Sequence, residues 1–289
     1  MINSVFQRRT TGSVVCPSCG SLVGVRDPKC YSCGRSNPGL WGYGPLIRRL
    51  STDFGFAPVV IGTCTIMYAL TLLLSGPAIF RGGLSILSPS SPALELLGMS
   101  GAIPVFVYGR WWTLLTASWL HGNLLHILFN MMWVRDLGPS MVEFYGSSRT
   151  IIIYTVSGVC GFLLSSVAGY VGIPIPFLHG ATYTIGASAS IFGLLGAMVH
   201  YGRSGAGSSF IYSTAMRYAV ILFVFGLIMP GVDNFGHAGG FLGGYAASSF
   251  LRPSTRERGD HMIAAFACVA ATVIALGYPM IRILPFLLP

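Results

Sequence analysis

Seven apolar runs, most of them near 20 residues long, dominate the sequence and decide what kind of fold the chain can adopt. A helix needs about 20 apolar residues to cross the hydrocarbon core of a bilayer. Only 9% of the residues are charged, against roughly 25% in a soluble domain. This excludes a soluble globular, disordered or collagen-like protein and predicts an all-α multi-pass membrane protein. We expect spans at about 57–75, 113–134, 150–170, 187–202, 209–229, 236–251 and 261–281.

The basic residues gather on one side of these predicted spans. Fourteen of the 17 Lys and Arg residues fall on the side of the N-terminus, and three fall on the other. The positive-inside rule therefore predicts a cytoplasmic N-terminus in the cell membrane. It also explains the net charge of +9 without a nucleic-acid partner. Residues 1–11 are polar and no apolar core follows them, so we expect no secretory signal.

The spans at 187–202 and 236–251 are short and rich in small residues, and we expect both in the interior of the bundle. The segment 76–112 is long, nearly uncharged, and ends in Trp111 and Trp112. Paired Trp residues are typical of a membrane interface, so we expect this segment to lie there rather than as a plain exposed loop.

Four cysteines near the N-terminus form a C-x2-C-x10-C-x2-C array: Cys16, Cys19, Cys30 and Cys33. Two such knuckles let four thiolates converge tetrahedrally on one zinc ion. Glycine follows each second cysteine and permits the tight turn of a knuckle. The alternatives are two disulfides or free thiols, and a reducing cytosol disfavours disulfides. The array predicts a small structural zinc module, because four cysteines leave no open coordination position.

Ionisable and polar residues are expensive inside a membrane, so each is a functional candidate. His126 and Asn130 are four residues apart and share one helix face. Ser188 begins the fourth span and His237 begins the sixth. Each also has another explanation. A serine can bond its own helix carbonyl or cap a helix start, a lone histidine can form a structural hydrogen bond or bind a metal, and the glycines can serve only packing. Together, His121, His126 and His237 could also form a metal site or a proton path.

All four side chains are expected at similar depth near the outer face of the membrane. Glycines on the fourth and sixth spans would let Ser188 meet His237 as nucleophile and base. His126, Asn130 and the Ser188 backbone N–H would then donate to a developing oxyanion. No carboxylate is placed as a third member, since Asp233 is expected to cap the sixth span. The residues thus favour a Ser–His dyad.

In this arrangement the sequence resembles the rhomboid intramembrane serine proteases. The resemblance spans about residues 57–252 and rests on Trp112, Leu120-His121-Gly, His126-Ile-Leu-Phe-Asn130, Gly186-Ala-Ser188 and His237-Ala-Gly-Gly240-Phe-Leu-Gly-Gly244. It implies a six-helix rhomboid bundle plus a C-terminal seventh helix. It also implies Ser188 as nucleophile, His237 as base, and His126 and Asn130 as oxyanion donors. Phe192 occupies the position whose ring packs on the catalytic histidine.

The resemblance further implies transmembrane protein substrates that reach the site between the second and fifth spans. We expect three regions: a cytoplasmic segment 1–55 holding the zinc module 16–33, a catalytic core 56–252, and a cytoplasmic loop with the seventh helix at 253–289. One departure concerns the residue after the nucleophile, where the family usually has glycine and this chain has Ala189. Its methyl group would crowd the oxyanion pocket if it pointed there.

Two other functions remain open at this stage. The chain could be a non-catalytic relative that binds transmembrane segments, and only Ala189 favours this. The zinc module could serve as an adaptor for a cytosolic partner, which is compatible with proteolysis.

Overall fold

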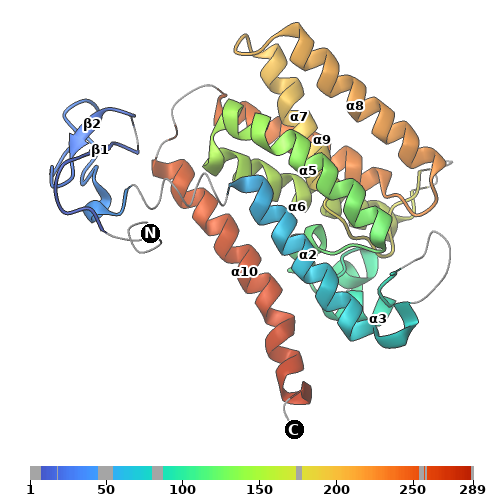
Figure 1. The fold of residues 1–289 in the computed structure, drawn as a ribbon. Coiled ribbons are helices and arrows are strands. Elements are labelled where there is room, and N and C mark those ends of the chain that lie inside the picture. The colour runs from blue at the N-terminus through green and yellow to red at the C-terminus, as the bar shows by residue number, and fades with distance from the viewer. Residues whose placement is uncertain are drawn as a thin grey trace.

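The computed structural model describes residues 8–17, 19–44, 55–79, 87–173, 178–253, 257 and 259–287. Within them a small N-terminal hairpin module precedes a bundle of helices (Figure 1). The strands are β1 (Ser13–Val15) and β2 (Leu22–Gly24), which pair antiparallel. The longer helices are α2 (Phe56–Ser75), α5 (Leu124–Tyr145), α6 (Ser147–Val171), α7 (Ser188–Arg203), α8 (Ser209–Ile228), α9 (Asn234–Leu251) and α10 (Gly259–Leu287). Shorter elements are η1 (Leu40–Gly42), η2 (Gly76–Ile79), α3 (Ser91–Leu96), η4 (Ile103–Val107), α4 (Thr113–Thr116) and η5 (Ala117–Trp119).

Four of the described helices are long and apolar enough to cross a membrane by themselves. They cover Phe56–Ser75, Ser147–Val171, Ser209–Ile228 and Asp260–Ile281. These correspond to the first, third, fifth and seventh predicted spans, and they confirm an all-α membrane protein. The other three long helices, α5, α7 and α9, are shorter or more polar, and they pack among the first set.

The second predicted span was placed too early. We expected a helix over 113–134, but α5 begins at Leu124 and continues to Tyr145. Asn123 ends the preceding turn because its Oδ1 accepts a hydrogen bond from the backbone N–H of His126 at 2.8 Å and caps the helix. At the far end the helix tolerates Pro139 and the neighbouring pair Arg135–Asp136, whose side chains bond at 2.8 Å. These two charged residues lower the hydropathy of the second half of α5, so the apolar pattern did not mark it as part of the span.

The expected interior position of the fourth span is confirmed, because most of α7 is buried. The sixth span, α9, is interior on one face only. Its glycine face is buried, while Leu242 and Phe250 are exposed.

Backbone contact between α7 and α9 requires glycine. A Cβ atom built on Gly240 would lie 2.0 Å from the carbonyl oxygen of Ala189, and one on Gly244 would lie 2.0 Å from that of Gly193. On the other helix, a Cβ on Gly196 would lie 2.2 Å from the Phe241 carbonyl oxygen. No side chain fits at these positions, so the two helices touch through their main chains.

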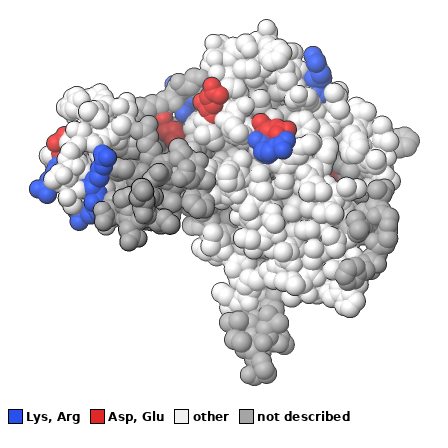
Figure 2. All heavy atoms as spheres, viewed as in Figure 1, with Lys and Arg blue, Asp and Glu red and all other residues white. Residues whose placement is uncertain are grey.

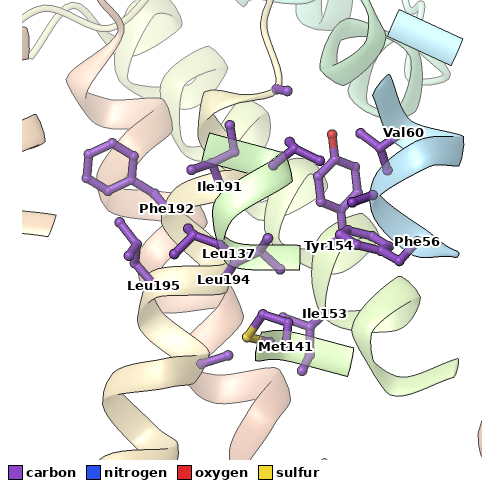
Figure 3. Packing of buried hydrophobic residues seen from close by; sticks show 14 of the residues in the cluster. Phe56, Val60, Leu137, Met141, Ile153, Tyr154, Ile191, Phe192, Leu194 and Leu195 are labelled. Carbon is purple, nitrogen blue, oxygen red and sulfur yellow. The ribbon is translucent and has the colours of Figure 1, made fainter. Parts of the chain in front are cut away.

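The largest apolar cluster fills the space between α2, α5, α6 and α7 (Figure 3). Phe56 of α2 packs edge-on against Tyr154 of α6, with ring centroids 5.4 Å apart. Side chains from α5, α7 and α8 complete the cluster. Those labelled in Figure 3 are Phe56, Val60, Leu137, Met141, Ile153, Tyr154, Ile191, Phe192, Leu194 and Leu195.

A buried arginine links the beginning of α6 to the end of α9. Arg149 donates from Nη1 to the carbonyl oxygens of Leu251 and Arg252 at 3.1 and 2.7 Å. Positive charge at the carboxyl end of α9 also complements the helix dipole. Glu257 accepts from the Ser148 N–H at 2.7 Å, so a carboxylate lies at the amino end of α6.

The segment before α7 is paired with the long loop that follows α2. Ser100 and Thr184 exchange backbone hydrogen bonds of 3.1 and 2.7 Å, and Ala102 N–H donates to Ala181 at 3.0 Å. The expectation that 76–112 lies at the membrane interface stays a prediction. In its described part Val107, Tyr108 and Trp111 are exposed, and residues 80–86 lie outside the described residues.

We expect Gly244→Ala to lower the thermal unfolding midpoint of the purified protein in detergent. The added methyl must push α9 from α7, and overpacking of this kind costs about 1–3 kcal/mol. Gly62→Ala in α2 is the matched control, since a Cβ there meets nothing within 4 Å. It should leave the midpoint unchanged or raise it. Equal midpoints for the two variants would contradict the close helix contact.

Candidate active site and candidate metal centre

Ser188 and His237 lie at the same interface, at the amino ends of α7 and α9. Ser188 is the first residue of α7 and is partly buried, and His237 lies in the first turn of α9 with 6% of its surface exposed. Phe192, one turn after Ser188, stacks on the His237 ring with centroids 4.1 Å apart and planes at 14°. No direct hydrogen bond joins the Ser188 and His237 side chains, both of which the structure describes. The fold therefore places the two residues on facing helices without pairing them.

Asn234 orients the imidazole of His237, a role that the sequence analysis missed. Its Oδ1 lies 3.2 Å from His237 Nδ1, one helical turn away, and both side chains are buried. With the amide oxygen facing the ring, Nδ1 carries the hydrogen and donates it, which leaves Nε2 as a proton acceptor. The i,i+3 spacing of Asn234 and His237 in the sequence was the available signal.

His126 presents a hydrogen-bond donor beside the start of α7. The Gly122 N–H donates to His126 Nδ1 at 3.3 Å, so the ring hydrogen resides on Nε2. A Cβ built on Gly186 would lie 2.6 Å from that Nε2 and 3.7 Å from Ser188 Oγ. Gly186 also has a φ of +123°, which favours glycine. His126 Nε2 and Ser188 Oγ thus border one small space that exists because Gly186 has no side chain.

Asn130 lies one turn beyond His126 and is almost fully buried. Its Nδ2 donates to the His126 carbonyl oxygen at 2.8 Å, which uses one of its two amide hydrogens. The second hydrogen is available to a ligand on the same helix face.

Asp233 is the expected N-cap of α9, and it also joins two other elements. Its Oδ1 accepts from the Gly236 N–H at 2.8 Å and from Ser165 Oγ of α6 at 2.7 Å. Its Oδ2 accepts from Thr184 Oγ1 at 2.7 Å, on the segment that leads to Ser188. One partly buried carboxylate therefore links the starts of both helices that carry the candidate dyad.

Ala189 directs its methyl group away from the space between Ser188 and His126. Its Cβ lies 2.7 Å from where a Cβ on Gly161 of α6 would be, and it belongs to an apolar cluster with Val105, Leu114, Ala117 and Phe162. Gly161 has no side chain, which leaves space on α6 for the Ala189 methyl group. The alanine that follows Ser188, where the sequence analysis expected the family's usual glycine, is thus accommodated by packing against α6.

Comparison with known proteins gives the family. The Rhomboid domain matches residues 108–254, about half of the chain, and this stretch includes all four candidate active-site residues. The chain belongs to the rhomboid family. Its helical bundle is the rhomboid bundle expected from the sequence, followed by α10 as the additional C-terminal helix.

Several curated rhomboid proteins are similar to this chain over part of their length. Rhomboid protease GluP of Bacillus subtilis (strain 168) is 33% identical over 174 residues, which are 59% of this chain and 32% of the relative. RHOMBOID-like protein 7 of Arabidopsis thaliana is 36% identical over 175 residues, 57% of this chain and 51% of the relative. Rhomboid-like protease 3 of Toxoplasma gondii is 26% identical over 201 residues, 67% of this chain and 72% of the relative. The chain spans about a third to a half of the first two relatives, whose names describe a protease and a rhomboid-like protein.

His121 is not part of a group of three possible metal ligands among the described residues. Its ring is fully buried and lies edge-on to His126 with centroids 5.1 Å apart. Among the described residues, the histidines do not form a group of three metal ligands, whereas the four N-terminal cysteines do.

The four cysteines converge as the array predicts. The Sγ atoms of Cys16, Cys19, Cys30 and Cys33 all lie within 4.8 Å of one another, and none forms a disulfide. In both knuckles the glycine after the second cysteine has a positive φ, +73° at Gly20 and +72° at Gly34. Each glycine donates its N–H to the first cysteine of its own knuckle, at 2.9 and 2.8 Å. The arrangement can bind a metal ion through four sulfur ligands.

Two of these thiols differ in acidity. The hydrogen bond to the Ser21 side chain lowers the pKa of Cys19 to about 5, while burial raises the pKa of Cys30 to about 11. Their Sγ atoms are 3.3 Å apart, so the proton of one thiol can form a hydrogen bond to the other sulfur. A metal ion would replace that proton and hold both sulfurs as thiolates.

Proposed function

We propose that this rhomboid is an intramembrane serine endopeptidase that cleaves a peptide bond in or beside a substrate's transmembrane helix. The observation that carries the proposal is the α7–α9 interface. There a buried, Asn234-oriented imidazole faces the helix that begins with Ser188, and Phe192 holds the ring by stacking. Membership of the family and the similarity to Rhomboid protease GluP support it.

In the proposed first step Ser188 Oγ attacks the substrate carbonyl carbon and His237 Nε2 takes the hydroxyl proton. Asn234 Oδ1 accepts from Nδ1–H and stabilises the imidazolium that forms. His237 then gives the proton to the leaving amine as the C–N bond breaks, which leaves an ester on Ser188. Water then attacks the ester carbon while His237 Nε2 takes its proton. The bond to Ser188 Oγ breaks, Oγ recovers the proton from His237, and the second product leaves as a carboxylic acid. Catalytic hydrogen bonds often form only with substrate, so the unpaired Ser188 and His237 side chains are compatible with this role.

Three donors are proposed to stabilise the oxyanion. His126 Nε2–H borders the space beside Ser188, and Asn130 retains one amide hydrogen. The third is the Ser188 backbone N–H. Ala187 provides no side-chain cap, so the first N–H groups of α7 remain available for negative charge, which the helix dipole also favours. Donors held in place before the reaction need no reorganisation as charge develops.

The substrate is proposed to be a membrane-spanning segment that unwinds locally. A helix in lipid keeps every carbonyl bonded, so only a segment weakened by glycine or proline can expose one to Ser188. The substrate would approach between α5 and α8. These helices meet there through aromatic side chains, with centroids 6.1 Å apart for Phe129–Phe225 and 5.2 Å for Trp133–Tyr218. Side chains can swing aside at lower cost than a packed backbone can separate.

The membrane orientation is also proposed. We infer that the chain lies in the cell membrane with its N-terminus in the cytoplasm, because 14 of 17 basic residues fall on that side of the spans. Ser188 and His237 then lie towards the outer face. The alternative of a non-catalytic relative rested on Ala189, whose methyl group packs against α6 instead of crowding the pocket.

We expect Ser188→Ala and His237→Ala each to abolish labelling by a fluorophosphonate probe and cleavage of a co-reconstituted single-span substrate. Each variant removes an atom that makes or breaks a bond. Ser190→Ala is the matched control. Ser190 is buried two residues away, and its Oγ lies 3.4 Å from Ser118 Oγ, so its loss removes one structural hydrogen bond. Labelling of Ser188→Ala at the wild-type level would refute the proposed nucleophile.

We expect Asn234→Ala to lower kcat by at least about ten-fold with little change in KM. The base then loses the acceptor that fixes its tautomer, while the substrate contacts remain. Asn234→Asp keeps an acceptor oxygen at that position and should retain more activity than Asn234→Ala. Thermal unfolding of both variants provides the folding control. If kcat is unchanged in Asn234→Ala, the orienting role is wrong.

We propose that the metal in the N-terminal module is zinc and that it is structural. The only apolar side chains in the module's small buried cluster, apart from its cysteines, are Val14, Val23 and Val25 among the described residues. So small a core needs a metal to fold.

Purified protein should accordingly carry about one zinc ion per chain by elemental mass spectrometry. Cys30→Ser should lose that zinc and leave residues 8–44 open to protease, whereas Cys268→Ser, at a cysteine in α10, should keep both properties. Retention of zinc by Cys30→Ser would contradict the four-cysteine site.

A further inference from the structure

The zinc-ribbon-like module displays a tryptophan that its fold holds in water. Trp41 is 69% exposed, and its φ of +53° lies in the left-handed region that bulky residues rarely adopt. Leu40 before it has a φ of +49°. An unusual backbone that presents a large aromatic side chain to solvent indicates a binding role for that side chain.

Hydrogen bonds from both sides keep this conformation. Arg8 Nε donates to the Trp41 carbonyl oxygen at 2.7 Å, and the Trp41 N–H donates to Asn37 Oδ1 at 3.3 Å. The next residue, Gly42, accepts from the Arg9 N–H at 3.0 Å. A Cβ at Gly42 would lie 1.9 Å from the Arg9 carbonyl oxygen, so the two segments touch there. The indole is thus held outward by the main chain.

Three arginines lie on the segments that form or contact the Trp41 loop. Arg8 and Arg9 are held against the loop as described, and the Arg8 guanidinium lies 5.8 Å from the centre of the half-exposed Tyr43 ring. Arg26 donates to the Thr10 carbonyl oxygen at 2.9 Å, which places its side chain next to the same segment. We name these five residues the Trp41 patch: Arg8, Arg9, Arg26, Trp41 and Tyr43.

The surface around the patch is positively charged. Residues 8–44 hold five basic side chains and a single acid, Asp27. Asp27 accepts from the Gly24 N–H at 2.6 Å and is engaged within the module. In Figure 2 most of the charged side chains on the described part of the module are basic, and the charged side chains on the visible face of the bundle are confined mainly to its upper part. A ligand for this surface should be anionic and should accept an indole.

The bilayer is always near the module. Eleven residues, 45–55, connect it to Phe56 at the start of the membrane-spanning α2. Even fully extended, that length reaches at most about 40 Å. A tether this short keeps the headgroups at a high effective concentration around the patch.

We propose that the Trp41 patch docks on the anionic lipid headgroups of the same bilayer that holds the helices. Trp is the side chain most suited to the interface, with an apolar ring and one polar N–H, and arginines attract anionic phospholipid. The three arginines contact phosphates while the indole enters the headgroup layer. Docking holds the module against the membrane surface. The inference does not depend on proteolysis and holds equally for the Ser188→Ala protein.

The test uses the zinc-loaded full chain in nanodiscs of phosphatidylcholine, with or without phosphatidylglycerol. Hydrogen–deuterium exchange of residues 37–44 is followed by mass spectrometry. We expect exchange to be about ten-fold slower with phosphatidylglycerol and the protection to disappear at high salt. Arg8→Gln should weaken docking by about five-fold, the value for one basic residue near an anionic surface. Trp41→Ala should also lose protection, and it leaves the backbone hydrogen bonds of the loop in place.

Lys29→Gln is the matched control. The substitution removes one positive charge, as Arg8→Gln does, but from an exposed residue outside the Trp41 patch. The backbone of Lys29 pairs with that of Ser36 in a β-bridge, and the variant should retain protection of residues 37–44. Zinc content of each variant shows that the module is folded. Equal exchange in neutral and anionic nanodiscs would overturn the proposal. Protection that does not depend on salt or on lipid charge would assign the patch to a protein contact. Protection that appears only after RNA is added would assign it to nucleic acid. Both results would overturn lipid docking.

Discussion

Main-chain contact between α7 and α9 is the constraint on which the rest of this structure depends. The two helices carry Ser188 and His237 near their amino ends, so the separation of the helices determines how far apart these two residues lie. Gly240 and Gly244 bring the α9 backbone against the carbonyl oxygens of Ala189 and Gly193. In lipid no hydrophobic force drives helices together, so such contacts rely on close packing of small residues. The glycines therefore serve stability and site geometry at once.

The second requirement is a defined hydrogen position on each imidazole. The Gly122 N–H makes His126 Nδ1 an acceptor and turns its Nε2 into a donor, while Asn234 makes His237 Nδ1 the donor and leaves its Nε2 as an acceptor. In the proposed mechanism the two histidines thus have opposite tasks, set by their neighbours. Neither task needs a carboxylate in contact with a ring, which agrees with a site assembled inside a membrane, where unpaired charge is costly.

The sequence predicted the membrane class, most of the helices and the cysteine cluster, because each depends on a local pattern. Apolar length marked α2, α6, α8 and α10, and knuckle spacing marked the four converging thiols. The start of α5 was misplaced because Asn123 caps the helix inside an apolar run, a detail that hydropathy does not register. The direction of the Ala189 methyl group and the role of Asn234 depend on packing between helices, which no single-helix pattern contains. The roles of Ser188, His237, His126 and Asn130 remain predictions.

Asp233 has a consequence for how the molecule would respond to force. Its carboxylate bonds Ser165, Thr184 and the start of α9, and Thr184 in turn shares two backbone hydrogen bonds with Ser100 in the long loop after α2. A pull on that loop would be passed through Thr184 to the beginnings of both helices together. The two halves of the site would then shift as one rigid unit instead of drifting apart, so that thickness or tension of the surrounding lipid could tilt the whole assembly while preserving its internal geometry.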